Sequence, residues 1–228
     1  MIPLAPVRIG PAVPIAPGVL SAIGKHPVDR PLRLGPEGFE GDQQADRRRH
    51  GGPEKAVHHY DAGHYPAWRD ELGDLPRLAP GGFGENLSSG GLTESGVAVG
   101  DRFRLGAALV EVSQARQPCW KLNIHFAVPD MARRVQDSGR TGWYYRVIEP
   151  GLVAPGDGLA LVARGAPGWT LDRLWRILYR DRLNRAELAE MAALEVLSES
   201  WRSLAQRRLD NAAVEDWTPR LQGSVVNP

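Results

Sequence analysis

The segment LVEVSQARQPCWK, residues 109–121, contains Cys119, which is the only cysteine among the 228 residues of the chain. The apolar, β-branched start of this segment predicts a strand, so the thiol lies close to the point where that strand ends. The flanking cations Arg116 and Lys121 would favour the thiolate, the form of cysteine that attacks electrophiles and binds metals. A free cysteine is also a common small apolar core residue, and position alone does not decide between these two interpretations.

The composition limits the expected cellular location of the protein and the kinds of partner that it can bind. A single cysteine leaves no partner for an intramolecular disulfide, which favours a reducing, cytoplasmic location. With 28 Lys and Arg against 27 Asp and Glu, the net charge of +1 gives no general attraction for nucleic acid or membranes. From Thr170 onward, nine arginines are matched by nine acidic residues, so this part lacks the basic excess of a DNA-binding module. We therefore expect no nucleic-acid polymer and no membrane among the partners.

Two domains are predicted from the pattern of apolar residues. The 26 glycines and 19 prolines indicate many turns between short strands. We expect strands within residues 19–24, 31–34, 56–60, 97–105, 109–112, 141–148 and 151–162, and short helices within residues 61–72 and 130–136. Asp61 can cap the first of these helices, which Pro66 would kink unless the helix starts later. After a linker at residues 165–168 the apolar period changes from two to about three and a half, and Thr170, Asn184 and Ser198 can each cap a helix. The prediction is a mainly β domain, residues 1–164, followed by a three-helix domain, residues 165–228.

Two glycine-rich loops are candidates for ligand binding. Residues 41–55 combine Gly51 and Gly52 with Arg47–Arg49, His50 and Lys55, groups that can bind a phosphate through backbone amides and charge-assisted hydrogen bonds. The simpler interpretation is a solvated run of charges. Residues 80–92 form the second loop, in which Glu85 and Asn86 offer polar groups to a ligand, although a plain connector would have the same composition.

The histidines allow further alternatives. His58, His59, Asp61 and His64 could be combined into a zinc site, but their spacing matches no strong metal motif, and packing among aromatic residues explains them better. A cysteine-nucleophile hydrolase would need a histidine beside Cys119, and His58 or His125 could serve.

The chain resembles the MOSC family, in particular its bacterial YiiM-like branch, through motifs that occur in the family's order. They are GFEGD (38–42), HGGP (50–53), GFGENL (82–87), VGD (99–101), VSQ (112–114) and RQPC (116–119). That branch also carries a three-helix carboxyl-terminal extension, so the resemblance covers nearly the whole chain. It implies a β-barrel-like core with short helices and a small helical domain.

The resemblance also implies a cofactor, the molybdenum cofactor (molybdopterin with Mo), and a role for Cys119 as its metal ligand. One thiolate is sufficient for such a metal, because the dithiolene sulfurs of the cofactor already hold it. Asn86 matches a cofactor-binding asparagine of the related amidoxime-reducing branch. The phosphate-binding arginine of that branch is replaced here by Gly84, so we assign cofactor contacts to the loops at Gly84 and Gly51–Gly52 and phosphate contacts to His50, Lys55 and Arg116.

The function implied by the resemblance is the reduction of N-hydroxylated compounds, such as hydroxylaminopurine-type bases or amidoximes. Two electrons break the N–O bond, and they come from an external electron donor protein, since the chain shows no flavin or iron–sulfur motif. Glu85, His50 or Lys55 could relay the proton that the departing oxygen needs. The alternative is a carrier that delivers the cofactor or holds sulfur on Cys119 as a persulfide. A homodimer is compatible with either function.

Overall fold

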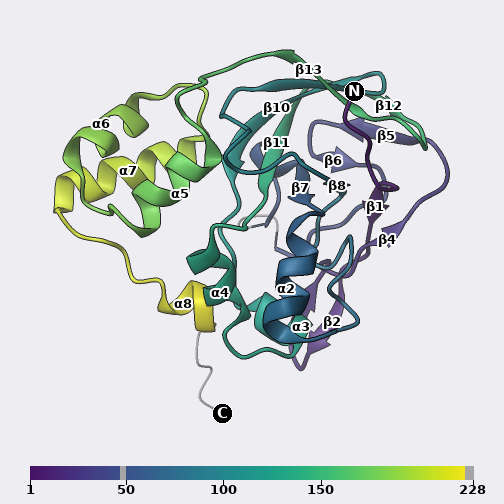
Figure 1. Ribbon diagram of the computed structural model, residues 1–228, viewed down its shortest axis with the longest axis horizontal. Helices are drawn as coiled ribbons and strands as arrows, with labels where there is room; N and C mark the ends of the chain where they lie inside the picture. Colours follow the sequence, from purple (N-terminus) through teal and green to yellow (C-terminus); the bar gives the residue numbers. More distant parts are fainter. Residues whose placement is uncertain (47–49, 224–228) are drawn as a thin grey trace.

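The computed structural model describes residues 1–46 and 50–223 and is organised around strand β10, Ala108–Ala115. This strand lies inside a six-stranded sheet of order β13-β9-β10-β11-β7-β8 (Figure 1). All eight residues of β10 are buried, and its polar side chains have partners, since Glu111 accepts from Arg102 and Arg146 and Ser113 donates to the carbonyl of Glu54. The other strands are β13 (Leu159–Ala163), β9 (Arg102–Leu105), β11 (Trp143–Glu149), β7 (Val57–Asp61) and β8 (Leu87–Ser89).

Pairing in this sheet is antiparallel except between β7 and β8. The register places Val110 opposite Val147 and Val112 opposite Tyr145, with irregularities on both sides of this stretch. Bulges increase the local twist and bend a strand. Here they accompany the change of direction that carries the chain out of the sheet toward Cys119.

Three small sheets complete the β part. They are β12-β5-β6 (Gly151–Val153, Leu32–Gly35, Gly38–Phe39), β1-β4 (Arg8–Ile9, His26–Pro27) and β2-β3 (Val13–Ala16, Val19–Ser21). Together with the six-stranded sheet they form a half-barrel, in agreement with the predicted fold class (Figure 1).

Short helices cover the lower end of the half-barrel in Figure 1: α2 (His64–Leu72), α3 (Lys121–Phe126) and α4 (Met131–Ser138). The 3-10 turn η1 (Pro53–Lys55) packs against β11 and β10. A buried cluster that includes Tyr60, Trp68 and Phe83 packs beneath α2, α3 and α4, and the rings of Tyr60 and Phe83 stack at 4.4 Å between centroids. The expected cap of α2 by Asp61 is wrong, since the cap position is Gly63. Pro66 therefore falls in the first turn, where its missing N–H breaks no helical hydrogen bond.

The carboxyl-terminal helices are α5 (Leu171–Tyr179), α6 (Arg185–Ala193) and α7 (Glu199–Asn211). Two of the three predicted caps are confirmed, because Thr170 accepts from the Arg173 amide and Asn184 from the Glu187 amide. Ser198 occupies the third cap position without such a bond. The buried face of α5 joins the apolar core of the sheet, so the domain boundary between residues 164 and 165 stays a prediction.

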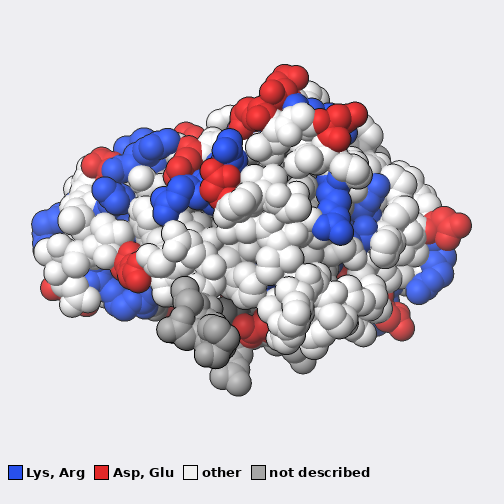
Figure 2. Space-filling model, turned by 90° about the horizontal axis from the view of Figure 1, so that it is seen from below, with Lys and Arg blue, Asp and Glu red and all other residues white. Residues whose placement is uncertain are grey.

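A fourth helix in this region, α8 (Thr218–Gln222), was not expected from the sequence. The chain returns from α7 to place α8 beside α4, at the lower end of the half-barrel (Figure 1). Seen from below, arginines alternate with acidic residues over the part formed by α5 to α7 (Figure 2). Within the described residues, none of the helices has the length and apolar character needed to cross a bilayer.

Candidate functional site

Cys119 lies in the segment between β10 and α3, and its side chain is partly exposed. It lines two adjoining hollows, which we call the first lobe, of about 630 Å³, and the second lobe, of about 850 Å³. Both lobes are also lined by His50, Lys55 and Tyr144. The thiol is therefore not sealed in the apolar core, and the interpretation of Cys119 as a core filler is wrong.

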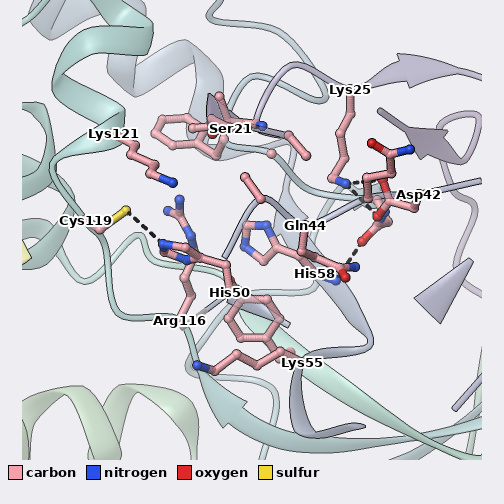
Figure 3. A pocket seen from close by; sticks show the side chains of 18 of the residues that line it. Ser21, Lys25, Asp42, Gln44, His50, Lys55, His58, Arg116, Cys119 and Lys121 are labelled. Atoms are coloured by element: carbon pink, nitrogen blue, oxygen red, sulfur yellow. Dashed lines mark hydrogen bonds and ion pairs between the residues drawn. The ribbon is translucent and has the colours of Figure 1, made fainter. Parts of the chain in front are cut away.

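The first lobe gathers residues from six separate parts of the chain, one of which is Tyr144 of β11 (Figure 3). Its lining includes Ser21–Ile23 and Lys25 near β3, Asp42–Ala45, His50 and Lys55 around η1, Phe83, Gly84 and Asn86 before β8, and Arg116, Cys119 and Lys121 after β10. Of the residues proposed from the sequence, Cys119, His50, Lys55, Arg116, Gly84 and Asn86 all reach this lobe. Glu85, Gly51 and Gly52 do not, and Arg47–Arg49 lie outside the described residues.

His50 is the histidine that adjoins the thiol, with its Nε2 atom 3.8 Å from Sγ of Cys119 (Figure 3). Burial lowers the pKa of His50 to about 4, and the positive charges of Lys121, Arg116 and Lys55 act in the same direction. At neutral pH the imidazole is therefore uncharged. A thiolate–imidazolium pair of the hydrolase type is disfavoured here, because the surrounding cations oppose protonation of the histidine.

Arg116 gives the first lobe its strongest anion-binding feature. Its side chain is only 6% exposed, and Nη1 has no hydrogen-bond partner in the described part of the chain. A buried guanidinium without an acceptor is costly, so this position is suited to a bound anion that supplies one. Burial also lowers the pKa of nearby Lys55, as expected for an ammonium group in a poorly solvated site.

Asn86 lies on the wall of the first lobe, but its side chain is already engaged within the protein. Its Oδ1 accepts from the His58 amide at 3.0 Å, while Nδ2 donates to the carbonyl of Arg8 at 2.9 Å and to Asp42 at 2.8 Å. Asp42 also accepts from Lys25, with one oxygen 2.6 Å from Nζ. Asn86 thus connects the segments that contain Arg8, Asp42 and His58. Direct contact of its side chain with a cofactor stays a prediction.

The backbone at Gly84 explains why an arginine does not stand at this position. Gly84 has φ +76°, and a Cβ atom added there would lie 3.1 Å from Cγ1 of Ile23. A larger residue would be strained and would crowd Ile23, so the positive charge must reach the lobe from elsewhere in the chain. Arg116, Lys55 and Lys121 are the cations that surround His50.

Glu85 points away from the lobe and is completely buried. Its carboxylate accepts from the Tyr65 hydroxyl at 2.5 Å, the Gly81 amide at 2.6 Å, the Ser88 hydroxyl at 2.9 Å and the Phe83 amide at 3.0 Å. These bonds fix the loop of residues 81–88. The position corrects the expected placement of Glu85 as a proton relay, because the structure gives this carboxylate no access to the lobe that contains the thiol.

Gly51 and Gly52 serve the site indirectly. Gly52 has φ +89°, and its carbonyl accepts from the Lys55 amide at 2.9 Å at the start of η1. This turn directs Lys55 toward both lobes. The predicted backbone contacts from these two glycines to a phosphate remain untested by the geometry.

His59 and His64 have structural partners, whereas His58 lines the first lobe and its buried Nε2 atom has no hydrogen-bond partner in the described part of the chain. His59 packs on Trp143 at 4.4 Å between ring centroids and bonds through its two nitrogens to Tyr145 and Ser89, which confirms aromatic packing at this position. His64 bonds to Glu94 at 2.8 Å. No group of three or more potential metal ligands of the His, Cys, Asp and Glu types is present in the part of the chain that the structure describes.

The second lobe contains residues that sequence reasoning did not assign to the site. Besides the four shared residues, its lining consists of Gln114, Gln117, Trp120, Pro219 and Arg220. The last two belong to α8, about a hundred positions beyond Cys119 in sequence. A proline near the start of a short helix is the sole local signal for α8, and that signal does not indicate where the helix packs.

Comparison with known proteins identifies a family for each of the two parts of the chain. The MOSC domain family matches residues 46–160, and the family described as YiiM-like, 3-alpha helix domain matches residues 169–212. Protein YiiM of Escherichia coli (strain K12) is 42% identical over 208 residues, which cover 90% of this chain and 92% of YiiM. Its crystal structure has a TM-score of 0.82 and 36% identity, covering 98% of this chain and all of that chain.

Two further relatives differ in length. The uncharacterized protein YflK of Bacillus subtilis (strain 168) is 46% identical over 190 residues, 83% of this chain and 85% of its own. A protein of Gibberella moniliformis (strain M3125 / FGSC 7600) named reductase is 36% identical over 196 residues, 85% of this chain. Those residues are 35% of the fungal protein, so the similarity concerns about a third of its length.

Proposed function

Since the chain belongs to the MOSC family and has the YiiM-like three-helix domain, we propose that it is a molybdenum-cofactor-dependent reductase of N-hydroxylated compounds. MOSC domains are associated with molybdenum cofactor binding, and one relative of this chain is named a reductase. These findings support a reductase or binding role connected with that cofactor. The substrates that we propose are hydroxylaminopurine-type bases and amidoximes, with amines and amidines as products.

The residues of the first lobe fit the cofactor, and the observation that carries the proposal is the buried Nη1 atom of Arg116, which has no hydrogen-bond partner among the described residues. A phosphate supplies the acceptor that buried Nη1 lacks, and a thiolate is a suitable single protein ligand for molybdenum already held by dithiolene sulfurs. Cys119 would hold the metal, while Arg116, Lys55 and Lys121 would neutralise the phosphate. Asn86 and Gly84 shape the wall between them.

When bound, the cofactor supplies the two electrons that break the N–O bond, and an external donor protein replaces them. The protein must deliver protons to the departing oxygen, which leaves as water. Lys55 is our candidate donor, since it lines both lobes and burial lowers its pKa toward the working range of an acid catalyst. Neutral His50, 3.8 Å from the thiol sulfur, would orient the thiol and exclude water rather than act as an imidazolium acid.

The test is the cofactor content of protein purified from cells that make the molybdenum cofactor. We expect close to one molybdenum and one pterin per chain, much less metal in Cys119→Ala, and reduced pterin retention in Arg116→Gln. Arg102→Gln is the control, because Arg102 is a partly exposed arginine at the start of β9 that pairs with Glu111 and lines neither lobe. Wild-type protein without metal or pterin would refute the proposal.

A carrier function is the second candidate, because Cys119 is partly exposed and could pass a bound group to another protein. Wild-type protein that retains the cofactor but does not consume 6-hydroxylaminopurine with reduced methyl viologen as electron source would favour it. Intact-mass measurement distinguishes a persulfide, which adds one sulfur atom to Cys119, from transfer of the whole cofactor.

A further inference from the structure

Arg220 of α8 is bound to the residues on both sides of Cys119. Its Nη1 atom donates to the carbonyl of Pro118 at 2.6 Å, and its own carbonyl accepts from the Trp120 amide at 2.8 Å. Nη2 donates to Oε1 of Gln136 in α4 at 2.5 Å. The position of the thiol is therefore fixed by a helix that lies beyond the part matched as the three-helix domain.

The two lobes on either side of Cys119 differ in chemistry. The first contains buried Arg116 with a free donor atom and the lysines 25, 55 and 121. The second adds two side-chain amides, an indole, a proline and Arg220 to the four shared residues. A phosphate-bearing cofactor matches the first lobe, which leaves the second lobe as the side from which another molecule can approach the thiol.

The walls of the second lobe are suited to a planar polar ring. Trp120 offers an aromatic surface, and Gln117 presents a carbonyl oxygen that can accept from an exocyclic N–H group. Gln114 also lines this lobe, but its amide nitrogen lies 3.4 Å from the Ala115 carbonyl and its oxygen 3.5 Å from the Ser200 hydroxyl, so both groups are engaged within the protein. Gln117 bonds to the Tyr179 hydroxyl through its nitrogen at 3.3 Å, so its side chain is oriented from α5.

The charges around the second lobe disfavour cationic ligands. Lys55 and Arg220 line the second lobe, Arg116 lies next to it in the first, and none of the described lining residues of the second lobe is a carboxylate. A cationic ligand would meet repulsion without a compensating acceptor, whereas an uncharged ring loses nothing from these neighbours.

We propose that the second lobe is the substrate subsite, that α8 is its outer wall, and that Arg220 is the positioning residue that holds Cys119 between substrate and cofactor. The subsite prefers an uncharged N-hydroxylated heterocycle to a cationic compound of similar size. The inference rests on the proposed function for the identity of the substrate, but the placement of α8 and the charge preference can be measured without turnover.

The first experiment measures the reactivity of Cys119 with iodoacetamide in protein freed of cofactor. Arg220→Gln removes both side-chain bonds of Arg220, so α8 should loosen and alkylation should be at least fivefold faster. Arg220→Lys keeps a cationic donor and should restore most of the protection, which separates a positioning role from loss of fold. Arg134→Gln is the matched control, because Arg134 is an exposed arginine that pairs with Asp130 on its own helix.

The second experiment compares adenine with benzamidine, a cation of similar shape, by calorimetry on protein purified with its cofactor. Adenine should bind at least tenfold more tightly, and Gln117→Ala should weaken adenine binding about tenfold without changing the content of molybdenum. In turnover with 6-hydroxylaminopurine, Gln117→Ala should raise KM and leave kcat nearly unchanged, whereas Arg220→Gln should lower kcat.

Equal binding of adenine and benzamidine, or an alkylation rate in Arg220→Gln within twofold of the wild type, would overturn the inference. A wild-type enzyme that binds adenine in this way but reduces no N-hydroxylated compound would instead contradict the proposed function. The two failures are therefore distinguishable.

Discussion

Replacement of Glu85 by glutamine distinguishes a structural carboxylate from a catalytic one. The carboxylate accepts four hydrogen bonds, two from backbone amides and two from hydroxyls. Glutamine keeps one acceptor oxygen but turns an N–H₂ group toward donors at Gly81 or Phe83. Each lost bond to a charged group is worth about 1.5–3 kcal/mol. Glutamine is uncharged and avoids the cost of burying a carboxylate, the same cost that raises the pKa of Glu85. This saving offsets part of the loss, so we expect a net destabilisation of about 2–4 kcal/mol.

The assay is urea unfolding followed by circular dichroism at pH 7, together with steady-state reduction of 6-hydroxylaminopurine below the unfolding transition. Glu85→Gln should lower the urea midpoint and leave kcat per folded, cofactor-loaded molecule within about twofold of the wild type. Glu71→Gln is the control, because Glu71 is a partly exposed carboxylate outside the buried loop, where it pairs with Arg140. A stable Glu85→Gln protein whose kcat falls more than tenfold would show that Glu85 relays the proton after all.

Three further predictions concern residues around the same site. Burial holds the pKa of His59 at about 3, so between pH 6.5 and about 3 the unfolded chain binds a proton that the folded protein does not, and stability falls as pH falls. In urea unfolding at pH 7, 6 and 5, His59→Gln should reduce this slope by about 1.4 kcal/mol per pH unit. Asn86→Ala leaves a buried amide without its acceptor and should cost about 2–3 kcal/mol in the same assay and weaken pterin retention; unchanged retention would show that the cofactor lies elsewhere. Gly84→Ala should lower the thermal midpoint more than Gly18→Ala, since both have positive φ but only the first meets a neighbouring side chain, and equal shifts would contradict the crowding argument.

Local features of the fold were predictable because their causes are local. The strand before Cys119 follows from a β-branched apolar run, and the starts of α5 and α6 follow from the capping side chains of Thr170 and Asn184. The order of strands in the six-stranded sheet and the parallel pairing of β7 with β8 depend on contacts between distant segments. Such contacts leave no periodic signal in the sequence.

The candidate site was predictable where the resemblance supplied an ordered motif. Cys119, His50 and Asn86 reach one hollow, as expected from motifs that are far apart in sequence. Glu85 points away from the lobe that its neighbours Gly84 and Asn86 line, because hydrogen bonds from Tyr65, Gly81, Phe83 and Ser88 hold its carboxylate, and sequence alone does not reveal these contacts. Lys25 lies on the wall through tertiary packing that no motif records.

The position of Arg220 could not be predicted either, because it also depends on contacts between distant segments. Its partners are Pro118 and Gln136, and the sequence between α7 and α8 gives no indication that the chain turns back toward β10. Only the packed structure shows that a residue outside both matched families contributes to the surroundings of the thiol.

The wide separation of the segments around Cys119 has a consequence for biosynthesis. Lys121 bonds to the carbonyl of Leu20, 101 positions earlier, and Arg220 to that of Pro118, 102 positions earlier. Contacts over such distances form late, because the intervening chain must first be ordered. During translation the thiol therefore leaves the ribosome long before the helix that shields it.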